Sequence, residues 1–92
     1  MTSKRYVLLE ADGDVSADDW KDLAEHLEAK FGKLKPIAVE GNRRALVVKT
    51  DNRVAPLIRV EAGMRVGGRR VRSVLTSGSI GRLKRRAAEG AA

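Results

Sequence analysis

The most constraining feature of this sequence is one apolar stripe at helical spacing between residues 20 and 31. The stripe consists of Trp20, Leu23, Ala24, Leu27 and Phe31. Apart from the adjacent pair Leu23-Ala24, steps of three and four residues place it on one face of a helix. Ser16 stands before it as an N-cap and Gly32 after it as a C-cap. A helix that is apolar on one side has to bury that side, so the rest of the chain must supply a second layer.

Short apolar segments bounded by turn residues supply that layer. We expect strands over residues 5–11, 35–40, 43–50 and 70–76, with Gly41-Asn42 as a tight turn between the second and third. Alternation places Val71, Ser73 and Leu75 on one face of the fourth strand and Arg72, Val74 and Thr76 on the other.

Two further helices are expected after the third and fourth strands. One is capped by Thr50, Asp51 or Asn52, carries Val54, Leu57, Ile58 and Ala62, tolerates Pro56 in its first turn and ends at Gly63. Gly67-Gly68 marks a break before the fourth strand. The other helix is basic, runs over residues 80–87, and is followed by a short frayed tail at 88–92.

This order of elements predicts an α+β fold of the ferredoxin-like or RRM-like split βαβ type. The expected architecture is one antiparallel four-stranded sheet with two helices on one face, plus the short basic C-terminal helix. The chain of 92 residues is one domain with an ordered core over residues 5–87. The other face of the sheet is expected to stay open and to offer a protein interface at Tyr6 and Leu8.

Charge is divided unevenly along the chain. Residues 1–42 carry six basic and nine acidic side chains, whereas residues 43–92 carry thirteen basic and three acidic, so the halves sum to −3 and +10. Eleven of those thirteen cations are arginine, whose planar fork matches phosphate. The second half therefore favours a polyanionic partner.

The chain offers little for catalysis. It has no cysteine and one histidine, His26, which we assign to the helix surface. An acidic cluster, comprising Asp12, Asp14, Asp18, Asp19 and Asp22, is better explained by helix capping than by metal binding. We expect no catalytic residue, no metal ligand and no cofactor bound by the protein itself. No segment approaches the length of a membrane span or a signal peptide, which predicts a cytoplasmic protein.

RNA is the polyanion that the pattern favours. The third strand lacks the aromatic residues on which a typical RNA-recognition motif stacks bases. Recognition by phosphate and shape is therefore expected. The residues predicted to bind RNA are Arg43, Arg44, Lys49, Arg53, Arg69, Arg70, Arg72, Ser77, Ser79, Arg82, Lys84, Arg85 and Arg86.

The segment 77–86 is the most specific feature. A strand ends in Ser77-Gly78-Ser79, and a helix begins under four cations in five positions. Free backbone N–H groups at a helix N-terminus bind phosphate. Ile80 and Leu83 are expected to anchor this helix to the body of the protein.

The same segment resembles the C-terminal signature of the small basic subunit, protein component 2, of archaeal and eukaryotic ribonuclease P. That signature is a strand with an Arg, a Ser-Gly-Thr/Ser-Ile turn and a basic helix, matched here by Arg72, Ser77-Gly78-Ser79-Ile80 and residues 82–86. Residues 5–10 are similar to the family's Arg-Tyr-apolar-apolar-Phe-Glu opening, with Leu9 in place of the aromatic. Lys49 and Arg59 stand where the family commonly has arginine.

The resemblance implies an RRM-like subunit without a catalytic site of its own. It implies binding to ribonuclease P RNA and precursor tRNA, with Mg²⁺ accompanying the RNA, during removal of the 5′ leader. It also implies pairing with the enzyme's TIM-barrel-like protein subunit, and self-association. Two alternatives remain at this point: another RNA-binding module of translation or RNA processing, and a small-molecule-binding regulatory domain of ferredoxin-like fold.

Overall fold

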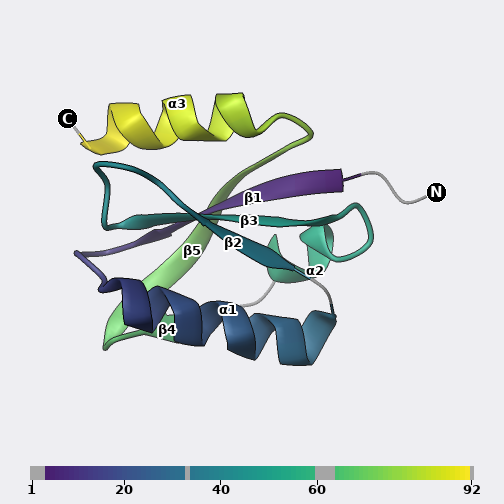
Figure 1. Ribbon diagram of the computed structural model, residues 1–92, viewed down its shortest axis with the longest axis horizontal. Coiled ribbons are helices and arrows are strands. Elements are labelled where there is room, and N and C mark those ends of the chain that lie inside the picture. The colour runs from purple at the N-terminus through teal and green to yellow at the C-terminus, as the bar shows by residue number, and fades with distance from the viewer. Residues whose placement is uncertain (1–3, 33, 60–63, 92) are drawn as a thin grey trace.

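The computed structural model describes residues 4–32, 34–59 and 64–91 (Figure 1). The elements are β1 Lys4–Ala11, α1 Ala17–Phe31, β2 Lys35–Ala38, β3 Ala45–Asp51, α2 Ala55–Arg59, β4 Arg65–Val66, β5 Arg69–Ser77 and α3 Ile80–Ala91. All strand pairs are antiparallel, in the order β2-β3-β1-β5-β4. The protein is thus an α+β domain built on a single antiparallel sheet, with α1 below it and α3 above it in Figure 1.

The first helix, α1, forms where the local signals at both of its ends agree. The Ser16 hydroxyl accepts a hydrogen bond from the Asp19 backbone N–H at 3.1 Å. The Gly32 N–H donates to the Glu28 carbonyl at 2.9 Å, and Gly32 has a φ of 100°, which favours glycine. The predicted helix and both of its caps are confirmed.

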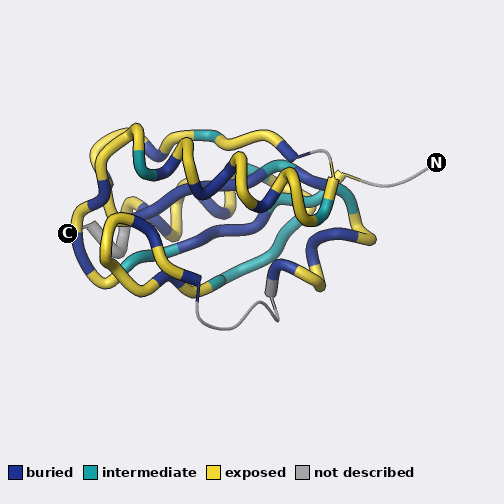
Figure 2. The backbone as a smooth tube through the Cα atoms, turned by 90° about the horizontal axis from the view of Figure 1, so that it is seen from below, coloured by how far each residue is buried: buried dark blue, intermediate teal, exposed yellow. Residues whose placement is uncertain are grey.

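Alternation along the central strand β1 sends its side chains into two separate cores. Val7 and Leu9 pack with residues of α1 and α2, whereas Leu8 belongs to a second cluster on the opposite face. The neighbouring strand β3 alternates in step, because its Val48 pairs with Val7 and its Val47 with Leu8. Buried residues accordingly run along the middle of the sheet in Figure 2.

A bulge in β5 interrupts the alternation of side chains predicted for that strand. Leu8 and Leu9 of β1 pair with Leu75 and Ser73, so Val74 is the extra residue between them. Val74 and Leu75, although adjacent in sequence, both pack against the second cluster. The prediction that placed them on opposite faces is wrong for this reason.

The strand β4 extends the sheet beyond the four strands predicted. Gly67 and Gly68 have φ values of 53° and 77°, and two consecutive positive values are what a type I′ hairpin turn requires. This turn pairs Val66 with Arg69. The break predicted at Gly67-Gly68 is therefore a hairpin, and two residues of strand are too few to produce a readable alternation.

The short helix α2 begins under the Asp51 carboxylate. Its Oδ1 atom accepts hydrogen bonds from the backbone N–H groups of Arg53 at 2.8 Å and Val54 at 2.9 Å. Asp51 is therefore the cap among the three candidates. Ala62 and Gly63, which were expected to continue and end the helix, lie outside the described residues.

The helix α3 lies across the sheet face that was predicted to be open (Figure 1). Leu83 and Ala87 are buried against Leu8 and Val47. The prediction that this face is open is therefore wrong. The apolar side of α3 has to be buried, and this is the face of the sheet that α1 and α2 leave uncovered. The helix also continues to Ala91, through most of the tail that was expected to fray.

The side chain of Asn42 fastens α3 to the turn between β2 and β3. Its Nδ2 donates to the Ala87 carbonyl at 2.9 Å, and its Oδ1 accepts from the Arg44 N–H at 3.0 Å. The turn itself is closed by the Asn42 N–H, which donates to the Val39 carbonyl at 3.2 Å. Asn42 is only 7% exposed, so a residue predicted merely to turn the chain also joins a helix to the sheet.

Candidate nucleic-acid interface

The outer side of α3 presents cations from a helix held in place by its inner side. The exposed cations are Arg82, Lys84, Arg85 and Arg86. Leu83, which lies among them, is 0% exposed, and Ile80 packs against the same cluster. Residues advance by about 100° around a helix, so Arg85 lies roughly opposite Leu83. The predicted anchoring of this helix by Ile80 and Leu83 is confirmed.

The turn that leads into α3 is held by a serine hydroxyl. The Ser79 N–H donates to Ser77 Oγ at 3.1 Å. The Arg5 guanidinium lies beside this turn, with Nη1 at 3.2 Å from the position that a Cβ on Gly78 would occupy. Arg5 therefore adds a cation next to the start of α3, and it was not among the predicted RNA contacts. Its place follows from the pairing of β1 with β5, which the sequence alone did not give.

Three lysines meet on the α3 side of the sheet, where β1, β2 and β3 begin or end. Lys49 of β3 pairs directly with Lys35 of β2 and with Tyr6 of β1. The Lys4 ammonium lowers the pKa of Lys49, and desolvation, a side-chain hydrogen bond with Lys4 and the charge of Lys35 lower it further. Sequence reasoning predicted Lys49 but missed Lys4 and Lys35, because only strand register brings the three together.

Two predicted arginines lie at the acidic loop between β1 and α1. Arg44 Nε is 3.5 Å from Asp14 Oδ1, and both side chains are largely exposed. The Arg69 guanidinium lies against Gly13, within 2.7 Å of where a Cβ would stand. A carboxylate neighbour competes with phosphate for a guanidinium, so Arg44 is a weaker candidate for RNA contact than the cations of α3.

The remaining predicted cations are exposed and spread around the sheet. They are Arg43, Arg53, Arg70 and Arg72. Arg72 stands directly opposite Glu10 of β1, and Arg53 follows the Asp51 cap of α2. The thirteen predicted residues therefore do not form a single patch, and α3 with its entry turn is the part that the structure brings together.

The two residues predicted to form a protein interface are not equally available. Leu8 is 0% exposed beneath α3, and Tyr6 is partly buried against the same cluster. Leu8 cannot contact a partner while α3 is in place. The physical reason is again that α3 occupies the face on which both residues lie.

The helix α1 carries the opposite charge and no evident chemistry. Its first turn holds Asp18 and Asp19, and His26 is exposed. Among residues 4–32, 34–59 and 64–91, no three His, Cys, Asp or Glu side chains are grouped so as to hold a metal ion. Over the same residues, no helix is both long and apolar enough to cross a membrane.

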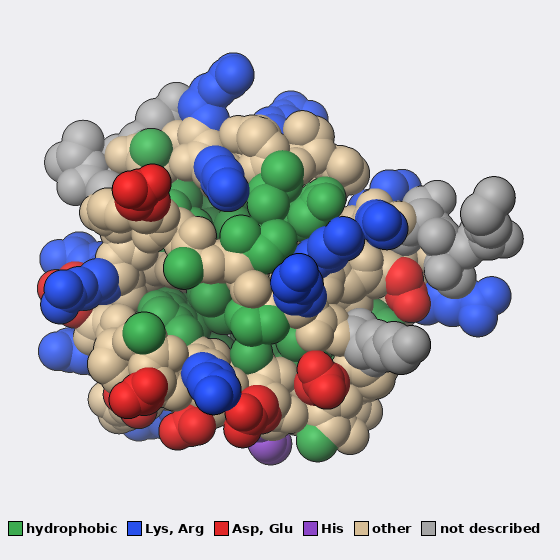
Figure 3. Space-filling model, viewed as in Figure 1, with side chains coloured by type: hydrophobic (Ala, Val, Ile, Leu, Met, Phe, Trp, Pro, Cys, Tyr) green, Lys and Arg blue, Asp and Glu red, His purple; other side chains and the backbone are tan. Residues whose placement is uncertain are grey.

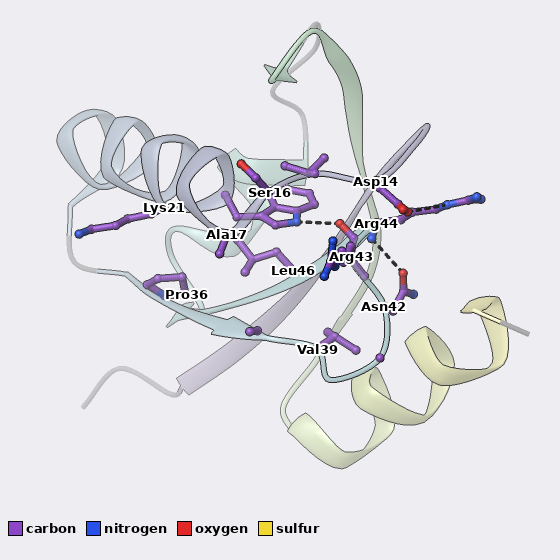
Figure 4. A pocket seen from close by; sticks show the side chains of 15 residues that line it. Asp14, Ser16, Ala17, Lys21, Pro36, Val39, Asn42, Arg43, Arg44 and Leu46 are labelled. Carbon is purple, nitrogen blue, oxygen red and sulfur yellow. Dashed lines mark hydrogen bonds and ion pairs between the residues drawn. The ribbon is translucent and has the colours of Figure 1, made fainter.

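An open groove of about 1060 Å³ lies between α1, β2 and the β2–β3 turn (Figure 4). Trp20 and Leu46 line the groove. The Trp20 indole N–H donates a hydrogen bond to the Arg43 carbonyl at 3.0 Å. Lys21 and Arg44 also line the groove. Figure 3 shows apolar side chains in the middle of this face of the molecule, with most of the acidic side chains below them. This groove was not predicted, because its walls come from two segments about 20 residues apart in the chain.

No family model matches the chain, and no curated protein matches it.

Proposed function

We propose that this protein is a non-catalytic subunit of ribonuclease P, which binds the catalytic RNA and supports removal of the 5′ leader from precursor tRNA. The observation that carries the proposal is the segment 77–86. A serine-held turn leads into a helix whose apolar side is buried and whose four cations are exposed. This is the segment that resembles the ribonuclease P subunit.

A seated helix is a better phosphate ligand than a mobile basic tail. Its cations are presented from a fixed platform, so less conformational entropy is lost when RNA binds. Arginine forks bind phosphate oxygens bidentately and screen the repulsion where RNA helices approach each other. The β3 strand offers no aromatic side chain for base stacking, so this recognition is expected to read phosphates and shape.

The proposal includes a ferredoxin-like arrangement of the fold. Its support is the order β2-β3-β1-β5, in which the first and third long strands, β1 and β3, lie together in the centre. Both α1 and α2 pack against the same face of that sheet. In this view β4 is an addition at the edge and α3 is an addition over the second face.

The TIM-barrel-like protein partner remains part of the proposal, but its docking surface is not the Tyr6–Leu8 face. That face is occupied by α3. The partner therefore has to use another surface, and loss of α3 contacts should not be required for it to bind.

The experiment that tests this function is reconstitution of precursor tRNA cleavage with catalytic RNA and a TIM-barrel-like partner subunit. The protein alone is expected to cleave nothing, and the complete mixture is expected to cleave more efficiently with the protein than without it. His26→Ala should leave that activity within about threefold, since an exposed side chain outside the interface contributes little.

The same reconstitution distinguishes the proposed function from the main alternative, another RNA-binding role. Binding of structured RNA without any gain in precursor tRNA cleavage would assign the protein to another RNA-binding role. Failure to bind any structured RNA would reject both readings together.

A further inference from the structure

The lysine cluster, defined as Lys4, Lys35 and Lys49, is unfavourable in the free protein. Lys35 and Lys49 are direct register partners on neighbouring strands, and like charges in that position destabilise a sheet. Lys4 is diagonal to Lys49, because Tyr6 pairs with Lys49 and Lys4 with Asp51. Diagonal neighbours are within reach of long side chains.

The neighbouring lysines change the pKa of the Lys49 amine. Its pKa is lowered first by the Lys4 ammonium, then by desolvation, a hydrogen bond with Lys4 and the Lys35 ammonium. A hydrogen bond between two amines requires one of them to be neutral, so it opposes the fully charged state.

One carboxylate lies beside the cluster, so its three ammoniums are only partly neutralised. Asp51 is the register partner of Lys4, but its Oδ1 atom accepts two backbone N–H bonds that cap α2. Glu10, which projects from the same face of β1, lies six residues along the strand from Lys4. At about 3.4 Å per residue, this places it about 20 Å away.

We propose that the lysine cluster binds a phosphate group on the α3 side of the sheet. An anion with two or three charged oxygens would relieve the repulsion among the three ammoniums and accept hydrogen bonds from each. Ser77 lies in the same row of the sheet, beyond Tyr6, so the turn that leads into α3 adjoins the site.

The choice of ligand rests on the proposed function, whereas the site itself does not. A ribonucleoprotein subunit would take the phosphate from an RNA backbone, and the chain would then cross from the exposed side of α3 to the strands beside it. The same three ammoniums would also accept a free phosphorylated compound. Two probes distinguish these sources: inorganic pyrophosphate and a short RNA hairpin.

The test is an NMR titration of the full chain, observing the lysine side-chain methylene signals next to Nζ. Pyrophosphate is expected to shift the signals of Lys35 and Lys49 before those of Lys21 and Lys84. Lys49→Gln should weaken pyrophosphate binding by about 3- to 10-fold, the effect of one lost ion contact. The matched control is Lys21→Gln, which removes the same charge from the exposed side of α1 and should leave pyrophosphate binding unchanged.

The hairpin arm measures affinity against salt concentration. Lys49→Gln should lower the magnitude of the log–log slope by about 0.7–0.9, one phosphate contact. Lys35→Gln, at an exposed position on an edge strand, provides a second variant whose fold is not at risk and should act in the same direction.

Equal weakening of pyrophosphate binding by Lys49→Gln and Lys21→Gln would overturn the site, since binding would then follow net charge alone. Pyrophosphate bound at the cluster by a protein that ignores RNA would uphold the site and reject the proposed function. RNA binding that is insensitive to both Lys35→Gln and Lys49→Gln would uphold the function and reject an RNA phosphate at this place.

Discussion

The helices α1 and α3 lie on opposite faces of one sheet and use charge in opposite ways. In α1, acidic residues occupy the first turn and Lys30 the last, the arrangement that the helix dipole favours. In α3, the first turn has no acidic residue and the last turn no basic one. The charges of α1 therefore stabilise the helix that carries them, whereas those of α3 do not. Packing holds α3 in place although its charges do not stabilise it, and such a helix is suited to binding an anion.

The largest expected effect comes from removing the apolar contacts that hold each helix to its own side of the sheet. Leu27 of α1 and Leu83 of α3 are both 0% exposed, and replacing a buried leucine by alanine costs about 2–5 kcal/mol. Leu27→Ala should lower the stability of the whole domain in urea unfolding. Leu83→Ala should release α3 first, which amide hydrogen exchange would detect as lost protection in α3 alone.

Unchanged exchange protection of α3 in Leu83→Ala would contradict the view that this side chain seats the helix. RNA binding by Leu83→Ala should fall by more than the decrease in its fraction of folded protein explains. In Leu27→Ala, binding should follow the folded fraction.

The next effect is on RNA affinity. Reversing Arg82 and Arg85 to Glu should weaken binding to structured RNA by about 10- to 100-fold near 0.1 M salt, because phosphate contacts are lost and repulsion is added. Reversing Lys21 and Lys30 on α1 makes the same change in net charge and should weaken binding by less than about threefold. Equal losses in the two double variants would show that α3 acts only through net charge.

The thermal stability of both double variants should stay close to that of the wild type, since exposed charges contribute little to folding. Melting curves recorded beside the binding data separate an interface effect from unfolding.

A smaller effect is expected at the link between α3 and the β2–β3 turn. Asn42→Ala removes both side-chain hydrogen bonds and should cost about 1–2 kcal/mol. Asn42→Asp keeps the acceptor for the Arg44 N–H but loses the donor to the Ala87 carbonyl. Urea unfolding should show that Asn42→Asp is also destabilised; stability equal to the wild type would mean that the bond to α3 contributes nothing.

The features that were predicted from sequence are those set by neighbouring residues. The bounds of α1 follow from Ser16, Gly32 and a stripe at regular spacing, all within one segment. The Asp51 cap and the start of α3 are local in the same sense. Such signals act before any tertiary contact forms, so they can be read without knowing the fold.

The features that were missed depend on contacts between distant segments. The bulge at Val74 changes which side chains of β5 share a face, and no residue type marks it. The bond from Asn42 to Ala87 spans 45 positions. The lysine cluster exists only through strand register, and α3 covers the sheet only because its anchors match an apolar face. The sequence indicated both the anchors and that face, yet it did not show that each is the other's partner.

The smallest expected effect is the change in melting temperature of Lys49→Gln. The direction of that change tests the repulsion within the lysine cluster. The pKa of Lys49 is lowered from 10.5, first by Lys4 and then by desolvation, with Lys35, Tyr6 and Asp51 as the other titratable groups facing it. A charged amine with a lowered pKa destabilises the fold at neutral pH. That penalty is lost as pH rises through the lowered pKa towards 10.5.

Lys49→Gln should therefore melt slightly higher than the wild type at pH 7 and low salt, and this advantage should shrink between pH 7 and pH 10.5. A paired thermal melt at the two pH values tests this. An advantage that grows with pH would contradict the repulsion within the lysine cluster.

The central claim is that α3 is a seated platform for RNA phosphates, and the salt dependence of binding tests it most directly. If about six cations neutralise phosphates, the log–log slope of affinity for a structured RNA should be about −4 to −5 in the wild type. Reversing Arg82 and Arg85 to Glu should reduce its magnitude by about 1.4–1.8, while reversing Lys21 and Lys30 should leave it unchanged. Affinity that is flat between low and moderate salt, or a slope that does not respond to the α3 reversals, would contradict the account.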